Sequence, residues 1–254
     1  MEKAVSIALW THPRSVSTAF ERYFLERRDF QVFHEEFSAI YQSNASRAKL
    51  PHARMSSGTP SDYVTVRDRM ENARFNGPVF HKDMCYHALD ALISDHDYLA
   101  GQKNVFLVRT PEEAVLSLAT IHPAMDFDCI GYAEMPVLFE HARQATGMIP
   151  LVIDSADLTR RPEATLRMVC EYAGVPFDPA ALVWQAAMPP QWQTWAAWHS
   201  EAALSSGFMA PRQSYSVTFD SHPKLRAMVD FCRPFYAHMK TFAPLNNQLA
   251  TECI

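Results

Sequence analysis

Short runs of apolar residues alternate with stretches of helical periodicity along the first half of the chain. Five runs have the length and composition of strands, and they lie at residues 5–10, 30–33, 78–82, 104–109 and 150–154. Directly after the first run, the apolar positions from Val16 onward follow the i, i+3, i+4, i+7 spacing of one helix face. This alternation is typical of βαβ units, and it predicts an α/β fold whose central, mostly parallel sheet has about five strands flanked by helices.

Two later helices carry clear start and stop signals. Thr110 and Pro111 supply an N-cap and a proline at the first helical position, and glutamates follow in the first turn. Pro162 opens another helix, and Gly174 is placed to end it in the left-handed conformation. Both helices follow predicted strands, as a βαβ arrangement requires.

Two regions depart from this alternation. Residues 43–77 are polar and broken by prolines, with one helix expected over residues 61–73, and we interpret them as an insertion over the sheet. Residues 180–254 lack strand signals and include a tryptophan-rich stretch, so we expect a helical C-terminal extension. The sequence shows no repeat and no long low-complexity segment, which favours a single domain over residues 1–254.

Charge and length exclude several functional classes. The 254 residues carry 23 Lys and Arg against 28 Asp and Glu, a formal net charge of -5. This balance argues against a general nucleic-acid-binding surface but permits a local cationic pocket. No apolar run approaches the roughly 18 residues of a membrane span, and the first run is too short for a signal sequence. We expect a cytoplasmic protein with neither nucleic acid nor membrane as a partner.

Glycine and cysteine usage removes two further kinds of site. The chain has 7 glycines and none before Gly58, so neither a Walker A loop nor a GxGxxG fingerprint follows the first strand. The 5 cysteines are scattered, odd in number and never in a CxxC pair. Neither a disulfide framework nor a zinc site is therefore implied, and we predict no metal site.

Three basic residues follow or end predicted strands. Arg14 comes after the first strand, Lys82 ends the third, and Arg109 ends the fourth. Because the carboxyl ends of parallel strands meet at one edge of a sheet, these cations should gather there. The sequence therefore predicts a site for an anionic ligand.

The turn between the first strand and its helix adds further anion-binding groups. Its residues 14–18 read Arg-Ser-Val-Ser-Thr, and N–H groups at a helix start point outwards unsatisfied. The hydroxyls of Ser15, Ser17 and Thr18 can add donors. Alternatively, Ser15 serves only as the N-cap of the helix.

Two segments resemble the nucleotide motifs of sulfotransferases that use 3′-phosphoadenosine 5′-phosphosulfate (PAPS). The segment THPRSVSTAFER is similar to their 5′-phosphosulfate loop, in an Arg-Ser variant. In VRTPEEAVLSL, the residues Arg109, Pro111 and Ser117 have the spacing of their 3′-phosphate signature. The segments DSADLTRRPEATLRMVCEYAGVPFD and WQTWAAWHSEAALSSGF are similar to later parts of a plant and bacterial sulfotransferase-like branch. The resemblance covers roughly residues 4–210.

This resemblance implies a three-layer, P-loop-like fold and a reaction. A sulfuryl group would move in line, without a metal, from PAPS to a hydroxyl or amine of a small-molecule acceptor, leaving 3′-phosphoadenosine 5′-phosphate (PAP). Arg14 and Lys82 would neutralise charge on the leaving phosphate. The implied nucleotide-binding residues are Arg14, Ser15, Val16, Ser17, Thr18, Arg109 and Ser117. Ser206 and Gly207 join them, because SSGFMAPRQS is the only candidate for the family's missing C-terminal glycine-rich loop.

The sequence departs from the family pattern at the loop and at the expected base. Val16 stands where many members carry glycine, which implies a less close approach of the backbone to the ligand. Met84 replaces the histidine that common cytosolic members carry two residues after the strand-three lysine. The bacterial branch more often uses a glutamate just after the second strand, and Glu35 or Glu36 stands there.

We expect Glu35 to be the general base, provided that the second strand lies beside the first. Glu36 is expected to point the other way, because side chains alternate along an extended chain. His81, His34 and His199 are alternative bases, although a lone histidine at a strand end is more often structural.

Two other functions stay open at this point. A P-loop-like small-molecule kinase would share the fold, but the sequence lacks the Walker Lys-Ser/Thr pair and an obvious Mg²⁺ carboxylate. A non-catalytic nucleotide-binding protein is the other reading, and Met84 is its best support. The aromatic and methionine side chains of Tyr63, Met70, Phe75, Met125 and Phe127 suggest a partly apolar acceptor. A homodimer is compatible with all of these readings.

Overall fold

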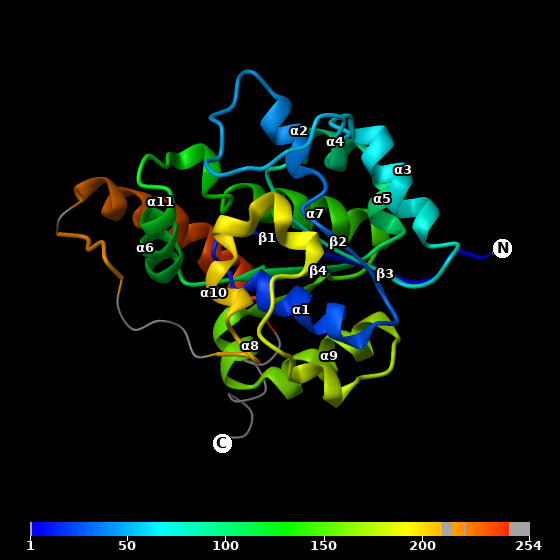
Figure 1. Ribbon diagram of the computed structural model, residues 1–254. Helices are drawn as coiled ribbons and strands as arrows, with labels where there is room; N and C mark the ends of the chain where they lie inside the picture. The colour runs from blue at the N-terminus through cyan, green and yellow to red at the C-terminus, as the bar shows by residue number, and fades with distance from the viewer. Residues whose placement is uncertain (1, 210–214, 221, 244–254) are drawn as a thin grey trace.

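A computed structural model describes residues 2–209, 215–220 and 222–243, and its centre is a five-stranded sheet (Figure 1). The strands are β1 (Ser6–Thr11), β2 (Gln31–His34), β3 (Val79–Met84), β4 (Lys103–Val108) and β5 (Leu151–Asp154). Every pairing in this sheet is parallel. The predicted α/β class is confirmed, and each strand lies within two residues of its predicted position.

The strand order is β2-β3-β1-β4-β5, which differs from the expectation for the second strand. β2 pairs with β3, and β3 separates it from β1. Val79 is level with Ser6 on one side and with Gln31 on the other, so the three strands start together. Because all three are parallel, the residues after β2 still reach the edge where β1 ends.

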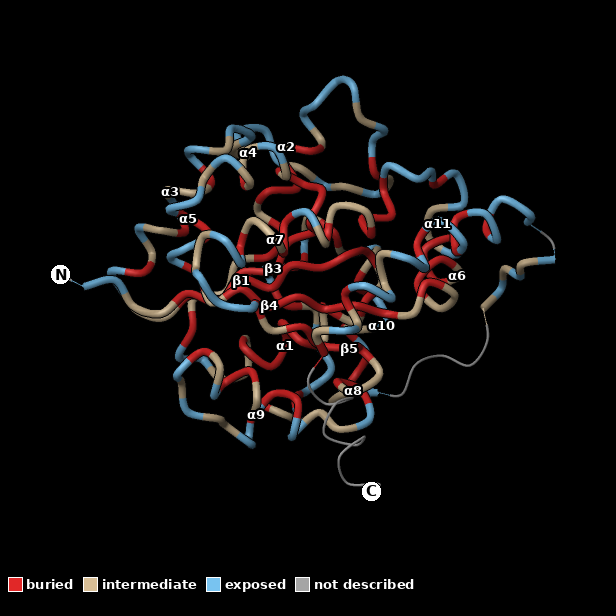
Figure 2. Tube along the Cα trace, turned by 180° about the vertical axis from the view of Figure 1, so that it is seen from behind, coloured by how far each residue is buried: buried red, intermediate tan, exposed pale blue. Residues whose placement is uncertain are grey.

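Helices cover both faces of the sheet and form the outer two layers. On one face, α1 (Ser17–Arg27), α8 (Ser155–Arg160) and α9 (Pro162–Ala173) pack on the odd-numbered residues of β1, such as Ile7 and Leu9. On the other face, the even-numbered Ala8 and Trp10 share a core with the following helices: α3 (Tyr63–Ala73), α4 (Leu89–Ser94), α5 (His96–Ala100), α7 (Glu134–Thr146) and α11 (Pro223–Lys240). Figure 2 shows the buried sheet between these exposed outer layers.

The helical layers bury the central strands of the sheet on both faces. All six residues of β1 and all six of β3 are buried, although β3 includes His81, Lys82 and Asp83. Such continuous burial is typical of parallel strands between two helical layers. A charged residue in such a strand needs a partner, and Lys82 has one at the site described below.

The remaining helices connect and flank these layers. They are α2 (Ser38–Ser43), α6 (Pro111–Ile121), η1 (Phe127–Cys129), η2 (Pro179–Leu182), η3 (Pro190–Trp198) and α10 (Ser200–Ala203), where η marks a 3-10 helix. One of them, η2, packs beside α1 and α9. Pro111 begins α6 and Gly174 ends α9 in the left-handed conformation, as predicted. Between residues 43 and 77, the structure has α3 as its regular helix, and Val66 and Met70 of α3 are buried in the core.

The C-terminal region is less helical than the sequence predicts. Its tryptophan-rich stretch forms η3, which is kinked at Trp195, rather than an α-helix. The described residues between α10 and α11 form no helix. Trp195 leaves the helical conformation, with a φ of -117° and a ψ of 27°, and this kink interrupts the stretch. No helix of the described ranges is long and apolar enough to cross a membrane.

We predict that the protein loses stability steeply as the pH falls from about 6.5 to about 4. Burial lowers the pKa of His12 and His81 to about 3 and the pKa of His87 to about 4. In this range the unfolded chain takes up protons at these positions and the folded chain does not. Each histidine thus lowers the free energy of unfolding by up to about 1.4 kcal/mol per pH unit. Burial also lowers the pKa of His199 and His122, which adds to this loss. It raises the pKa of Asp83, Glu36 and Glu134, which acts in the opposite sense but involves fewer groups.

Urea unfolding at pH 7 and at pH 5 measures this loss. The variant His81→Gln should reduce the proton difference between the unfolded and folded chains by about one, because glutamine does not titrate. Equal free energies of unfolding of the unmodified protein at the two pH values would contradict the prediction.

Candidate functional site

A cavity of about 410 Å³ opens where the carboxyl ends of β1, β3 and β4 meet. Its lining joins the β1–α1 loop, the end of β3, the first turns of α6 and the segment that carries η3 and α10. Figure 1 shows that segment, in yellow, lying over the start of α1. The lining includes many of the residues expected from the sequence: Arg14, Val16, Ser17, Thr18, Glu35, Lys82, Arg109, Ser117 and Gly207.

The β1–α1 loop makes a tight turn without glycine. Arg14 and Val16 both have positive φ angles, 63° and 72°. A β-branched residue is strained in this left-handed region, which explains why glycine suits the position of Val16. The loop conformation, and not only the approach of a ligand, therefore depends on this residue.

His12 fixes this loop to the end of β4. Its Nε2 accepts a hydrogen bond from the Arg109 backbone N–H at 3.0 Å, and its Nδ1 lies 2.9 Å from the Pro13 carbonyl oxygen. The ring stacks on Tyr132 with centroids 4.0 Å apart. Sequence reasoning missed His12, although its place between a strand and the Arg-Ser turn was a signal. Its contacts place Arg14 beside Arg109.

Ser15 does not cap α1. Its buried hydroxyl hydrogen-bonds to the hydroxyl of Thr11, and the N-cap position is Val16 instead. No side chain in the described part of the chain caps this end of the helix. Ser17 and Thr18 open the helix and line the cavity. N–H groups in the first turn of a helix lack intrahelical acceptors, so this end of α1 suits an anion.

The two predicted nucleotide motifs meet at Arg14. Its Nε donates to Ser117 Oγ at 2.9 Å, and its Nη1 donates to the Trp198 carbonyl oxygen at 2.8 Å. Arg109 Nη1 donates to the Arg14 carbonyl oxygen at 2.8 Å, and its Nη2 donates to the Tyr215 hydroxyl at 3.0 Å. Residues from three separate parts of the sequence thus form one hydrogen-bonded group at the cavity.

Lys82 and Glu35 form an ion pair at the cavity wall. β3 continues to Met84, so Lys82 lies inside the strand, and its side chain is fully buried. Its Nζ donates to Glu35 Oε1, while the Glu35 N–H donates to the Lys82 carbonyl oxygen at 2.7 Å. Burial alone would raise the pKa of Glu35, but the charge and the hydrogen bond of Lys82 lower it to about 2. Glu35 is therefore a carboxylate at neutral pH.

Two of the alternative bases lie away from the cavity. His81 points to the opposite face of the sheet from Lys82, where its ring packs on Trp10 and its Nε2 meets the Tyr98 hydroxyl at 3.0 Å. Glu36 Oε2 accepts a hydrogen bond from Arg69 Nη1 at 2.9 Å, and neither residue is among the described lining residues. The structure thus brings Glu35 to the site, but not His81 or Glu36.

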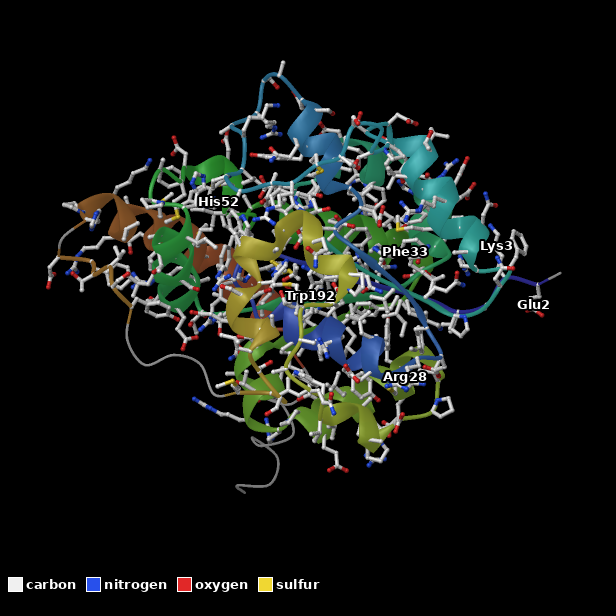
Figure 3. All side chains as sticks on the ribbon, viewed as in Figure 1. Glu2, Lys3, Arg28, Phe33, His52 and Trp192 are labelled. Carbon is white, nitrogen blue, oxygen red and sulfur yellow. The ribbon has the colours of Figure 1, made fainter. Side chains whose placement is uncertain are left out.

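The other two alternative bases belong to a buried chain of hydrogen bonds. His34 Nδ1 lies 2.7 Å from Glu21 Oε2, and His34 Nε2 lies 2.9 Å from His199 Nε2. His199 Nδ1 lies 3.1 Å from Thr18 Oγ1 at the cavity. At the far end, Trp192 Nε1 donates to Glu21 Oε1 at 2.7 Å, and Figure 3 labels Trp192 on the segment that lies across α1.

His34, Glu35 and His199 are also buried groups whose ligand atoms lie within 4.8 Å of one another, close enough for a metal ion. Each ring nitrogen of the two histidines already has a hydrogen-bond partner, and Glu35 is paired with Lys82. These contacts use the atoms that would bind a metal. We therefore assign the three residues to the hydrogen-bond network.

Part of the cavity wall is apolar. This part includes Leu50, Met84, Tyr86, Trp195 and Trp198. Met84 occupies the wall at the position where the sequence comparison expected a histidine. Gly207 also lines the cavity, whereas Ser206 is not among the described lining residues and its carbonyl oxygen accepts a hydrogen bond from the Trp184 N–H. Residues 210–214 of the SSGFMAPRQS segment lie outside the described residues.

Comparison with known proteins relates this chain to sulfotransferases. Two proteins of Arabidopsis thaliana, named branched-chain-amino-acid aminotransferase-like protein 2 and protein 1, are 30% identical over 241 residues and 28% identical over 213 residues. These alignments cover 92% and 83% of this chain but 42% and 37% of the relatives. The chain thus spans less than half the length of either relative.

A solved structure shares the fold of this chain, and a family model matches its sequence. A sulfotransferase from Alicyclobacillus acidocaldarius has the same fold, with a TM-score of 0.53 at 14% sequence identity over 94% of this chain and 95% of that one. The family model described as "Sulfotransferase domain" matches residues 5–243. Because this match spans nearly the whole chain, the protein belongs to the sulfotransferase domain family.

Proposed function

We propose that this protein transfers a sulfuryl group from PAPS to a hydroxyl or amine of a small, partly apolar acceptor. The observation that carries the proposal is the hydrogen-bonded group of Arg14, Ser117 and Arg109 at one cavity. These residues come from the two segments that resemble the 5′-phosphosulfate and 3′-phosphate motifs. Their contact supports one site for both ends of the nucleotide.

The charges of the cavity fit an anionic nucleotide. Among the described lining residues, Arg14, Lys82 and Arg109 are cationic, and Glu35 and Glu201 are the carboxylates. The uncapped start of α1 adds N–H donors beside Ser17 and Thr18. We assign the phosphosulfate to Arg14 and the start of α1, and the 3′-phosphate to Arg109 and Ser117.

Three side chains would carry the chemistry. PAPS, when bound, supplies an activated sulfuryl group, which passes to the acceptor while PAP leaves. Arg14 and Lys82 stabilise the negative charge that grows on the leaving phosphate. Glu35 accepts the proton of the acceptor group, because it is a carboxylate at neutral pH and lines the same cavity. These fixed charges supply the electrostatic stabilisation without requiring a metal.

The apolar wall favours an acceptor that has an apolar body in addition to its polar group. Trp195, Trp198 and Met84 would bury its carbon skeleton, while Glu35 faces its nucleophilic group. Burial of an apolar group in such a pocket stabilises binding by about 25 cal/mol per Å² of apolar surface. We therefore expect an aromatic or aliphatic body with one hydroxyl or amine.

Calorimetric titration with PAP, adenosine 5′-monophosphate and Mg-ATP tests the proposal. PAP should bind at least about tenfold more tightly than the monophosphate, because only PAP engages the 3′-phosphate site. Labelled PAPS should then transfer its label to a component of pooled small hydroxyl and amine compounds. Preferential binding of Mg-ATP would instead indicate a kinase, and PAP binding without label transfer to any pool would indicate a non-catalytic nucleotide-binding protein.

A further inference from the structure

We propose that the buried chain Thr18–His199–His34–Glu21 takes up one proton when the anionic nucleotide binds. In this proposal His199 is a positioning residue that sets whether the Thr18 hydroxyl donates into the protein or into the cavity. The inference rests on the proposed function, since it requires an anionic nucleotide at the start of α1. Thr18 and Glu21 lie in the segment that resembles the phosphosulfate loop, whereas His34 and His199 lie outside both nucleotide motifs.

The chain is continuous and shielded from water. Its three contacts measure 2.7, 2.9 and 3.1 Å from the Glu21 carboxylate to the Thr18 hydroxyl. Glu21 is fully buried, and His34 and His199 are each 7% exposed. Of these four residues, Thr18 and His199 line the cavity, and Thr18 ends the chain there with its hydroxyl group. In such surroundings each hydrogen bond must have one donor and one acceptor, so the direction of one contact fixes the next.

Without the nucleotide, the donors of this chain all point toward Glu21. The Glu21 carboxylate accepts from Trp192 Nε1 and from His34 Nδ1, so His34 carries a proton on Nδ1. Burial lowers the pKa of His199 well below its usual value, so this ring carries a single proton. With one proton on each ring, His199 Nε2 donates to His34 Nε2, and Thr18 donates to His199 Nδ1.

An anion in the cavity reverses this order. Phosphate oxygens only accept hydrogen bonds, so Thr18 must turn its hydrogen away from His199 to donate to them. Two facing lone pairs would then remain between Thr18 Oγ1 and His199 Nδ1. The contact is restored when the His199 proton moves from Nε2 to Nδ1. His199 Nε2 then accepts from His34 Nε2–H.

This reversal changes the proton count by one. His34 now carries protons on both ring nitrogens, and the cationic ring is paired with the Glu21 carboxylate. His199 keeps a single proton, and Thr18 keeps its hydrogen. The additional proton comes from solvent and is held by the His34–Glu21 pair.

Charged groups on several elements act on His34 and His199. Glu21 approaches His34 from α1 at 2.7 Å, and Glu35 Oε1 lies 3.8 Å from its Nε2. Among the described residues, Glu36, Lys82, His87 and Arg14 also interact electrostatically with one of the two rings. The two nearby carboxylates favour a cationic His34, whereas Lys82 opposes it. A bound nucleotide adds negative charge at the cavity and so favours the cation.

Isothermal titration calorimetry with PAP, in buffers of different ionisation enthalpy, measures the proton count. At about pH 8, where PAP itself is almost fully ionised and a free histidine is neutral, we expect the uptake of about one proton per PAP bound. The variant His199→Phe keeps a ring but removes both nitrogens, so uptake should disappear while PAP still binds. The control His87→Gln removes another buried histidine of the cavity and should keep the uptake.

The outcomes separate this inference from the function on which it rests. PAP binding without proton uptake overturns the chain mechanism and leaves the proposed function standing. Uptake that persists in His199→Phe, or that is lost only in His87→Gln, assigns the proton elsewhere and also overturns it. No PAP binding by the unmodified protein overturns both.

A direct measurement on the unmodified protein covers the case in which His199→Phe does not fold. Nitrogen-15 spectra of histidine-labelled protein at about pH 8 report the protonation of both His34 nitrogens. We expect a neutral ring without PAP and a cationic ring, or a protonated Glu21 beside it, with PAP bound. An unchanged state of the His34–Glu21 pair in the two samples overturns the inference.

Discussion

Replacing Arg14 by alanine is expected to weaken PAP binding by roughly 30- to 1000-fold, which corresponds to about 2–4 kcal/mol. Arg14 is only partly exposed and joins the helix start to Ser117 and to the Trp198 carbonyl oxygen. Its loss removes a charge-assisted contact to the phosphosulfate and the link between the two nucleotide motifs. Transfer activity should fall at least as much as affinity, since the same charge stabilises the leaving phosphate. Calorimetry with PAP and label transfer from PAPS measure the two effects.

Two further variants make this result interpretable. Arg14→Lys keeps the charge but loses the fork of the guanidinium group, so its affinity should lie between those of the alanine variant and the unmodified protein. Arg143→Ala removes an equal charge from an exposed position on α7, where Arg143 pairs with Glu140, and should leave PAP binding unchanged. Full PAP affinity in a folded Arg14→Ala protein would place the phosphosulfate elsewhere.

The local pattern of the sequence was sufficient for the strands but not for their order. Each strand is an apolar run bounded by polar or turn residues, so its position can be read locally. The pairing of β2 with β3 joins Gln31 to Val79, and two helices, α2 and α3, and a long polar stretch separate the two strands in sequence. Nothing local to β2 distinguishes β1 from β3 as its neighbour. The site prediction survived this difference because parallel strands end at one edge in either order.

The site residues also divide into those with a local sequence signal and those without one. Arg14, Arg109 and Ser117 lie in motifs with fixed spacing, and the structure brings them into one hydrogen-bonded group. The position of His81 was predictable in principle, because adjacent residues of a strand face opposite sides, so His81 and Lys82 cannot both face the cavity. The pairing of His34 with His199 joins positions 165 residues apart and has no local signal.

At Val16, the departure from the family's glycine has a different consequence from the one that the sequence predicts. The absence of glycine suggested a looser approach to the ligand, whereas the φ angle of 72° shows that the backbone still adopts the conformation that glycine favours. The strain of a β-branched residue in this region is on the order of 1–2 kcal/mol and is held by the surrounding contacts. The contacts of His12 with Arg109 and Tyr132 are among those that hold the loop.

The variant Glu35→Gln is expected to lose about 10²- to 10⁴-fold in kcat, the usual range for a positioned general base, and to keep PAP affinity within a few-fold. Glutamine has the shape of glutamate and can still meet Lys82, but it cannot accept the proton of the acceptor group. Glu36→Gln is the matched control, because Glu36 pairs with Arg69 outside the cavity lining and should retain full kcat. Rates of label transfer at saturating PAPS and acceptor measure both variants.

The pH dependence of the rates tests the role of Lys82 in the same step. In the free protein the pKa of Glu35 is lowered to about 2, so the carboxylate stays charged throughout the range in which the protein is folded, and kcat/KM should show no acidic limb from this residue. If Lys82 turns toward the leaving phosphate when the nucleotide binds, its hold on Glu35 weakens and the pKa of Glu35 rises. An acidic limb should then appear in kcat and should be absent in Glu35→Gln. A kcat of Glu35→Gln equal to that of the unmodified protein, with a loss in His199→Phe or in a substitution of His34, would transfer the role of base to the histidine chain.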